Sequence, residues 1–259
     1  MKVTILGVRG SIPTDGPEFC EYGGATSCIL VEADGQAIYL DAGSGLLRAP
    51  NTGEAEVSIL LTHSHMDHIL GLPLSPVLLS DKTLDLYLKK REGLSAKDQL
   101  ERLMAPPLWP VGVEQYPSEV LFHDLELPMQ LGRVQVTGME SNHPGGSTIY
   151  RLDLEGRSLV YATDYEHTEE KQSELSEFAR DTDLLLYDAQ YTEEEYARMK
   201  GFGHSTVAEG MKVLKQSGAK RIVFVHHDPR HSDAKLREME NALTDHRASF
   251  AKAGDVFEL

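Results

Sequence analysis

The segment Val57-Ser58-Ile59-Leu60-Leu61-Thr62-His63-Ser64-His65-Met66-Asp67-His68 joins an apolar run to a dense group of metal-binding side chains. Residues 57–62 have the apolar, β-branched character of a buried strand. Three imidazoles and a carboxylate that follow such a strand are hard to desolvate together unless a cation neutralises them. His63 and His65 flank Ser64 and can point to one side, whereas Asp67 and His68 turn toward a second point. The segment therefore predicts a site for two metal ions, and a solvated His-rich turn is the alternative.

The rest of the chain alternates between apolar, strand-like runs and the polar clusters that follow them. Turn residues such as Gly23-Gly24 and Asp34-Gly35 separate the first strands. The second half repeats this arrangement. The expected strands cover residues 2–6, 27–33, 36–41, 57–62, 134–139, 147–154, 158–163, 183–187 and 221–225, and the polar side chains that follow the later strands are His143, Asp164, Asp188 and His226.

Helices are expected between these strands. In residues 206–216, Thr206 and Glu209 have the spacing of a capping box, apolar residues share one face, and Gly218 supplies a stop. A last helix is expected to begin near Ser232. Two sets of strands, each followed by helices, predict an α/β protein with two sheets packed face to face and helices outside, a four-layer α/β/β/α sandwich.

Residues 81–120 follow a less regular pattern than the rest. They include Ala105-Pro106-Pro107-Leu108-Trp109-Pro110, which predicts a loop that lies over another part of the molecule. Two interpretations of this region stay open. It is either a lid or wall of a substrate site, or a surface excursion without a function.

Length and composition limit the class of protein. The 259 residues are at the upper end of what one hydrophobic core organises, and no linker divides them, so one domain over residues 1–259 is expected. Lys and Arg number 25 against 41 Asp and Glu, and the net charge of −16 weighs against long nucleic acids as partners. No apolar run is long enough for a bilayer and no secretory signal is recognised, so a cytoplasmic protein without a membrane partner is expected. Cys20 and Cys28 are too few for a disulfide framework, and Cys28 is expected in the core.

The order of the motifs resembles that of the metallo-β-lactamase superfamily. Residues 63–68 match its HxHxDH signature, and the similarity extends over roughly residues 4–232. The chain looks closest to the ribonuclease-Z-like and phosphodiesterase branch of this superfamily. The motifs that carry this resemblance are Gly7-Val8-Arg9-Gly10-Ser11, Tyr22-Gly23-Gly24, Asp41-Ala42-Gly43, Gly203-His204-Ser205-Thr206 and Val225-His226-His227-Asp228.

The resemblance implies two divalent metal ions and a ligand set for each. One ion would be bound by His63, His65, His143 and Asp164, and the other by Asp67, His68, Asp164 and His226. Asp164 would be shared, because only a carboxylate offers two oxygens to two ions. His227 stays open as the alternative to its neighbour His226. Zinc is the first expectation, with manganese or iron as alternatives, because His and Asp accept all three metals.

Asp67 and His204 are the candidates for catalysis. Asp67 would hold or receive a proton of the attacking water. His204 precedes the helix expected at residue 206, where backbone N–H groups favour anions, and the matching residue of the phosphodiesterase branch contacts the scissile phosphate. Asp188 either orients the imidazole of His204 or caps a turn.

The expected function is hydrolysis of a phosphodiester at the two metal ions. His65 stands where the di-iron, oxygen-reducing members of the superfamily carry Glu, which disfavours redox chemistry. The negative charge and the lack of a basic, protruding arm favour a small substrate, such as a cyclic nucleotide or a nucleotidyl ester. The alternatives are a ribonuclease-Z-like endonuclease on transfer RNA precursors, a hydrolase of a lactone, lactam or thioester, and a metal-bound, partner-binding module without catalysis. A homodimer is the default expectation for a soluble enzyme.

Overall fold

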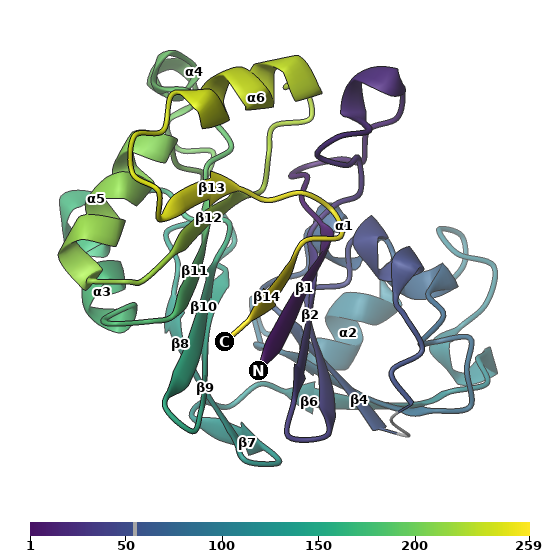
Figure 1. Cartoon of the computed structure of the whole chain (residues 1–259). Coiled ribbons are helices and arrows are strands. Elements are labelled where there is room, and N and C mark those ends of the chain that lie inside the picture. The colour runs from purple at the N-terminus through teal and green to yellow at the C-terminus, as the bar shows by residue number, and fades with distance from the viewer. Residues whose placement is uncertain (54–55) are drawn as a thin grey trace.

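Two mixed sheets with helices on their outer faces make up the fold, in a computed structural model that describes residues 1–53 and 56–259 (Figure 1). In spatial order, the first sheet contains β14 (Val256–Glu258), β1 (Lys2–Gly7), β2 (Cys28–Ala33), β3 (Gln36–Leu40), β4 (Glu56–Leu61), β5 (Thr83–Leu88) and β6 (Glu119–Asp124). The second contains β13 (Ala248–Phe250), β12 (Ile222–Val225), β11 (Leu184–Asp188), β10 (Arg157–Ala162), β9 (Thr148–Leu154), β8 (Val134–Glu140) and β7 (Met129–Leu131).

Both sheets have the same pattern of strand directions. In the first sheet, neighbouring strands from β14 to β3 are antiparallel and those from β3 to β6 are parallel. In the second sheet, the strands from β7 to β10 are antiparallel and those from β10 to β13 are parallel. The carboxyl ends of neighbouring parallel strands lie at one edge of a sheet. Each sheet therefore has an edge where loops after several strands come together.

Alternating side chains divide the core into three layers. The inner faces of the two sheets meet in one apolar cluster, which includes Leu60 of β4 and Leu186 of β11. Ile59 and Leu61, on the opposite face of β4, pack in a second cluster with α2. A third cluster joins the outer face of the second sheet to α3, α5 and α6. The sandwich predicted from the alternation of strands and helices is therefore confirmed.

The helices cover the outer faces of the sheets and connect their strands. Figure 1 shows α3, α5 and α6 on the side of the second sheet and α2 on the side of the first. The α-helices are α1 (Met66–Ile69), α2 (Ala96–Glu101), α3 (Glu169–Phe178), α4 (Glu193–Met199), α5 (Val207–Ser217) and α6 (Asp233–Asn241), and the 3-10 helices are η1 (Pro17–Phe19), η2 (Ser44–Arg48), η3 (Leu72–Leu74) and η4 (Val113–Gln115). Within the described residues, none of the helices has the length and hydropathy that crossing a membrane requires.

The predicted helix ends agree with the structure in most details. Thr206 caps α5 by accepting a hydrogen bond from the backbone N–H of Glu209, and Gly218 follows in the left-handed conformation at φ 72°. The expected capping box is only half formed, because the carboxylate of Glu209 bonds to Gln172 and Lys212 instead. Ser232 caps α6 as predicted. The side chain of Glu209 therefore makes these contacts in place of a hydrogen bond to the backbone N–H of Thr206.

Residues 81–120 are more regular than the sequence indicated. They contain β5 and the first two residues of β6, two strands that extend the parallel part of the first sheet, and α2 lies between them. In β5, buried Leu84, Leu86 and Leu88 alternate with partly exposed residues. Lysines at residues 82, 89 and 90 flank this short alternation, so the sequence pattern did not indicate a strand there. The segment Ala105-Pro106-Pro107-Leu108-Trp109-Pro110 is a loop, as expected.

Replacement of Leu186 by Ala tests the layer between the sheets. Leu186 is fully buried there, so the Leu186→Ala variant should lose about 3 kcal/mol of unfolding free energy. Urea unfolding followed by circular dichroism measures this loss. Leu121→Ala is the control, because Leu121 is 40% exposed on β6 and should change the free energy by less than about 1 kcal/mol. Equal effects of the two substitutions would contradict this layering.

Candidate metal centre

Three residues of the candidate site lie within two residues of a strand end and have an uncommon backbone conformation. Asp41 follows β3, Asp164 lies two residues beyond β10, and His226 follows β12, with φ values of 63°, 52° and 61°. A left-handed conformation is unfavourable for residues with a side chain and persists only where the surroundings hold it. The chain therefore turns sharply at three strand ends, and the turned residues are buried.

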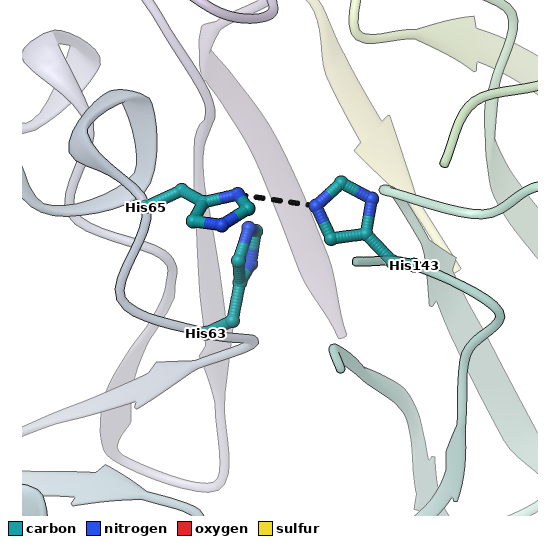
Figure 2. Close-up of side chains that lie close together, drawn as sticks. All are labelled: His63, His65 and His143. Carbon is teal, nitrogen blue, oxygen red and sulfur yellow. Dashed lines mark hydrogen bonds between the residues drawn. The ribbon is translucent and has the colours of Figure 1, made fainter. Parts of the chain in front are cut away.

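Three imidazoles form a first cluster. Figure 2 shows His63 and His65 on one loop and His143 facing them from another segment. The ring centre of His63 lies 4.3 Å from that of His65 and 4.9 Å from that of His143. His143 Nδ1 donates to the carbonyl oxygen of Gly203 at 3.1 Å, so its Nε2 carries the lone pair and faces His65 Nδ1 at 3.1 Å. One ligand atom from each residue lies within 4.8 Å of the others, and the three could hold a metal ion.

Asp67, His68, Asp164 and His226 form a second cluster in which every residue is buried. Oδ2 of Asp67 lies 3.2 Å from Nε2 of both His68 and His226. Oδ2 of Asp164 lies 3.0 Å from Nε2 of His68 and 3.3 Å from Nε2 of His226. The other oxygen of Asp164, Oδ1, faces the first cluster, at 3.8 Å from His63 Nε2 and 3.7 Å from His143 Nε2. Asp164 therefore lies between the two clusters with one oxygen toward each.

The protonation states of the first cluster suit metal binding. Burial lowers the pKa of His63, His65 and His143 below the ordinary value, so these imidazoles are neutral and keep a lone pair. In the second cluster burial opposes the charged imidazole, but the carboxylates raise the pKa of His68 well above its ordinary value and that of His226 to about 9. Positive charge is therefore required there, as protons or as cations.

Buried nitrogen atoms without hydrogen bonds indicate whether the two clusters can bind cations. Nε2 of His63 and Nε2 of His68 are buried without a hydrogen bond, although the latter is close to Asp164 Oδ2. Nδ1 of His68 bonds to Asp41 at 2.8 Å, which leaves the lone pair on Nε2 of the neutral ring. A lone pair directed at a carboxylate is repulsive unless a cation lies between them. The donor set therefore fits divalent cations.

Asp41 supports the second cluster through a hydrogen bond to Nδ1 of His68, the nitrogen that faces away from the cluster. Its carboxylate accepts from the backbone N–H of Thr62 at 2.8 Å, from Nδ1–H of His68 and from the hydroxyl of Tyr161 at 3.0 Å. Tyr161 lies on β10 of the second sheet, whereas Asp41 and Thr62 follow strands of the first. A single buried carboxylate thus orients one imidazole and ties the two sheets together.

Asp188 orients the imidazole of His204, as Asp41 orients that of His68. Its Oδ2 accepts from Nδ1 of His204 at 2.9 Å and from the backbone N–H of Asp164 at 3.0 Å. Both roles left open for Asp188 are present, because its Oδ1 also accepts from the backbone N–H of Gln190 at 3.1 Å. The contact with Nδ1 leaves Nε2 of His204, which makes no hydrogen bond to any described residue, on the far side of the ring from Asp188. His204 lines the same cavity as Asp67 and Asp164.

The structure separates the adjacent residues His226 and His227. His226 Nε2 faces the two carboxylates, and its Nδ1 bonds to the amide oxygen of Gln190 at 2.9 Å. His227 turns away and contacts the carbonyl oxygen of Ala251 at 2.9 Å, and burial lowers its pKa to about 3. Only His226 therefore belongs to the cluster. Gly10 packs against it so closely that a Cβ would lie 2.3 Å from its Nδ1.

Glu166 fixes the loop that carries Phe202, Gly203 and His204. Its carboxylate accepts from the backbone N–H of Gly201 at 2.8 Å and from that of Gly203 at 3.0 Å. Its own backbone bonds to Asn142, the residue before His143. Glu166 is 8% exposed, so water has little access to replace its carboxylate at these N–H groups. One acidic side chain therefore links the His204 loop to the His143 loop.

The comparisons with known proteins agree with this geometry. The family described as "Beta-lactamase superfamily domain" matches residues 37–227. The chain belongs to this family. The similarity to proteins named ribonuclease Z places it in the ribonuclease-Z-like branch of the metallo-β-lactamase superfamily, as the motifs indicated.

Two kinds of relative illustrate the match. A ribonuclease Z of Haloferax volcanii is 27% identical over an alignment that covers 100% of this chain and 95% of the relative. The metallo-beta-lactamase fold protein YhfI of Bacillus subtilis has a TM-score of 0.75 at 20% identity, covering 100% of this chain and 99% of that one. A diphosphatase of the PhnP family has a TM-score of 0.72 at 20% identity, covering 100% and 97%. At this identity the two structures establish the fold of the superfamily.

Several residues that build the centre were absent from the predicted set. Asp41 appeared only as part of a motif, and neither Gln190 nor Glu166 was assigned a role. A signal was available for Asp41, because an acidic residue that ends the apolar run at residues 36–40 is expected to need a partner. Glu166 had none, because its partners are backbone N–H groups 35 and 37 residues away.

Removal of the Glu166 carboxylate should loosen the loop before His204. In Glu166→Ala the buried N–H groups of Gly201 and Gly203 lose their acceptor, which should reduce the unfolding free energy by about 1–3 kcal/mol. Hydrogen exchange at residues 200–204 should accelerate in the same variant. Glu194→Ala is the control, since Glu194 is exposed on α4 and its one ion pair among the described residues is with Arg198. Unchanged exchange in Glu166→Ala would show that the loop is held by other contacts.

Proposed function

We propose that this chain is a metal-dependent hydrolase of phosphodiesters. The observation that supports it best is the position of Asp164, whose two oxygens face two separate groups of His and Asp side chains. His204, held by a buried carboxylate, lies beside both groups. A centre for two cations with an oriented imidazole at its border suits the hydrolysis of an ester with a negatively charged reacting group.

The proposed ligands are those of the two clusters. His63, His65 and His143 would hold one ion, Asp67, His68 and His226 the other, and Asp164 would serve both. When bound, two divalent cations activate water near neutral pH and offset the negative charge of a phosphoryl group. Hydrogen bonds to buried partners fix which nitrogen carries the proton in four imidazoles. These pairs are His68 with Asp41, His204 with Asp188, His226 with Gln190, and His143 with the Gly203 carbonyl. Zinc remains the first candidate, with manganese and iron as the alternatives.

Asp67 and His204 carry the proposed proton transfers. Asp67 is ionised, because the neighbouring imidazoles lower its pKa despite burial, and it can take a proton from an attacking water. Its Oδ2 also accepts from the backbone N–H of Ser11 at 2.7 Å, which limits the rotation of the carboxylate. His204 keeps Nε2 free to contact a phosphoryl oxygen or to donate a proton to the departing alkoxide. The contact with the Asp188 carboxylate orients that imidazole.

A small substrate suits the mouth of the site. Phe202, which is 57% exposed, lines the mouth together with Met66 and Pro144 and offers a ring against which a planar group can stack. The net charge of −16 disfavours a long polyanion. The alignment with the Haloferax volcanii ribonuclease Z spans 314 positions, so that relative has segments without a counterpart in these 259 residues. A cyclic nucleotide or a nucleotidyl ester therefore remains the proposed class.

Cleavage of RNA is the second candidate function. The relatives named ribonuclease Z favour it. The two candidates differ in affinity for the polymer: an RNA-cleaving protein should shift precursor transfer RNA in a gel, and the shift should weaken as salt rises. Cleavage of bis(p-nitrophenyl) phosphate without such a shift favours the small substrate.

Metal removal should destabilise the protein. We expect about two metal ions per chain by elemental analysis, and a chelator should lower the melting temperature because charged and unpaired groups then share a buried volume. His143→Ala should reduce the metal content. His123→Ala, which removes an imidazole paired with Asp85 outside both clusters, should leave it unchanged. A chain that keeps its melting temperature in chelator and contains no metal would contradict the proposal.

Substitution of the two catalytic candidates should affect turnover more than folding. His204→Ala and Asp67→Ala should each lower kcat on bis(p-nitrophenyl) phosphate by about 10²–10⁴, the usual contribution of a general acid or base. The melting temperature and metal content of His204→Ala should stay close to those of the parent. Asp67→Ala should also lose metal, since Asp67 is a proposed ligand. Full activity of the metal-loaded His204→Ala variant would remove His204 from the reaction.

A further inference from the structure

A cavity of about 360 Å³ opens beside His63 and His65. Three parts of the chain line it: the turn after β4, residues 91–108 around α2, and Gly145-Gly146. Two of its lining residues, His65 and Met66, also line the mouth that contains His204 and Phe202. A molecule bound at the proposed metal centre would therefore extend into this cavity.

The walls of the cavity are mostly apolar. Leu108 is 70% exposed and Met66 is 51% exposed, although both are large hydrophobic side chains. The other apolar lining residues are Ile69, Leu94 and Leu103. Exposed apolar side chains that gather around a concave surface are typical of a site for the organic part of a ligand.

The cationic side chains of the cavity are not equivalent. Arg91 is engaged, because it donates to Glu140 and to Thr148. Arg102, which directly follows α2, is exposed and has neither an ion pair nor a side-chain hydrogen bond within residues 1–53 and 56–259. Glu92 is the acidic side chain of the lining, and it does not pair with Arg102. Asp98, on the preceding turn of α2, attracts Arg102 only over a longer range, without a hydrogen bond or ion pair. In a chain with a net charge of −16, a guanidinium without a hydrogen-bonded partner in an apolar cavity favours an anionic ligand.

We propose that this cavity is the specificity subsite for the group next to the scissile bond, and that Arg102 binds a second anionic group of the substrate. The proposal rests on the proposed function and narrows its substrate class. The substrate is a phosphodiester with an apolar or aromatic body of about nucleoside size and a further terminal phosphate. The apolar walls hold the body, and the planar guanidinium binds the terminal phosphate oxygens. Residues 91–108 then form a substrate wall, which is one of the two interpretations left open by the sequence.

Two matched substrates test this subsite. The p-nitrophenyl ester of thymidine 5′-phosphate and the same ester with a 3′-phosphate share one scissile bond and one leaving group. The parent protein should prefer the 3′-phosphorylated ester on the order of tenfold in kcat/KM, through a lower KM, as a charge-assisted hydrogen bond predicts. Arg102→Glu should abolish this preference.

Lys97→Glu is the matched control. Lys97 lies on α2, pairs with Glu101 and does not line the cavity, and its substitution changes the net charge by the same amount. It should keep the preference. An equal preference in the parent and Arg102→Glu, or no preference in the parent, would overturn the subsite. So would equal losses in Arg102→Glu and Lys97→Glu, since these would reflect overall charge.

A binding measurement separates this proposal from the proposed function. Calorimetry with thymidine 3′,5′-bisphosphate and thymidine 5′-phosphate on the metal-loaded protein needs no turnover. Tighter binding of the bisphosphate that is lost in Arg102→Glu supports the subsite even if neither ester is cleaved, in which case the proposed phosphodiesterase activity fails alone. Equal binding of the two nucleotides, with cleavage of both esters, overturns the subsite and leaves the phosphodiesterase proposal standing.

Discussion

The packing of two sheets through one apolar layer brings the polar strand ends together. Leu60 and Leu186 meet in that layer, from opposite sheets. Beyond it, the turn after β4 supplies His63, His65, Asp67 and His68, whereas the second sheet supplies the residues after β8, β10 and β12. Asp41 secures this edge by bonding to Tyr161 of the opposite sheet. The site therefore depends on the relative position of the sheets, and a small shift between them would separate its two halves.

The buried charge of the centre is the second constraint. Asp67 and Asp164 are buried carboxylates among five imidazoles, and burial without compensation is strongly unfavourable. Protons on His68 and His226 compensate in part, whereas Nε2 of His63 in the first cluster stays buried without a hydrogen bond. Divalent cations would offset the negative charge of the carboxylates and would also accept the lone pairs of the imidazoles. This electrostatic requirement links the folding of the centre to metal binding, as in other sites where ligands are assembled by the fold.

The loops on the two sides of the metal centre carry different kinds of side chain. Glu166 holds the loop with Phe202 and His204 on one side, and residues 91–108 enclose the apolar cavity with Arg102 on the other. The His204 side suits proton transfer at the reacting bond. The Arg102 side suits recognition of the remaining substrate. Specificity in a common hydrolase fold is expected to lie in such loop-borne features, because the metal ligands are compatible with several esters.

The sequence by itself determined strands β1 to β4 and β8 to β12, the layered architecture and the local cluster of residues 63–68. These follow from short-range alternation and from ligands adjacent in the chain. It also marked His143, Asp164 and His226 by their positions after strands. The tertiary structure decided what depends on distant partners. In the structure, His226 faces the carboxylates of the centre and His227 faces away from them. Asp41 and Glu166 accept hydrogen bonds from residues far away in the chain. Strand β5 pairs with β4 although lysines flank it in the sequence. These features depend on contacts between segments far apart in the chain, and such contacts leave no local pattern in a single sequence.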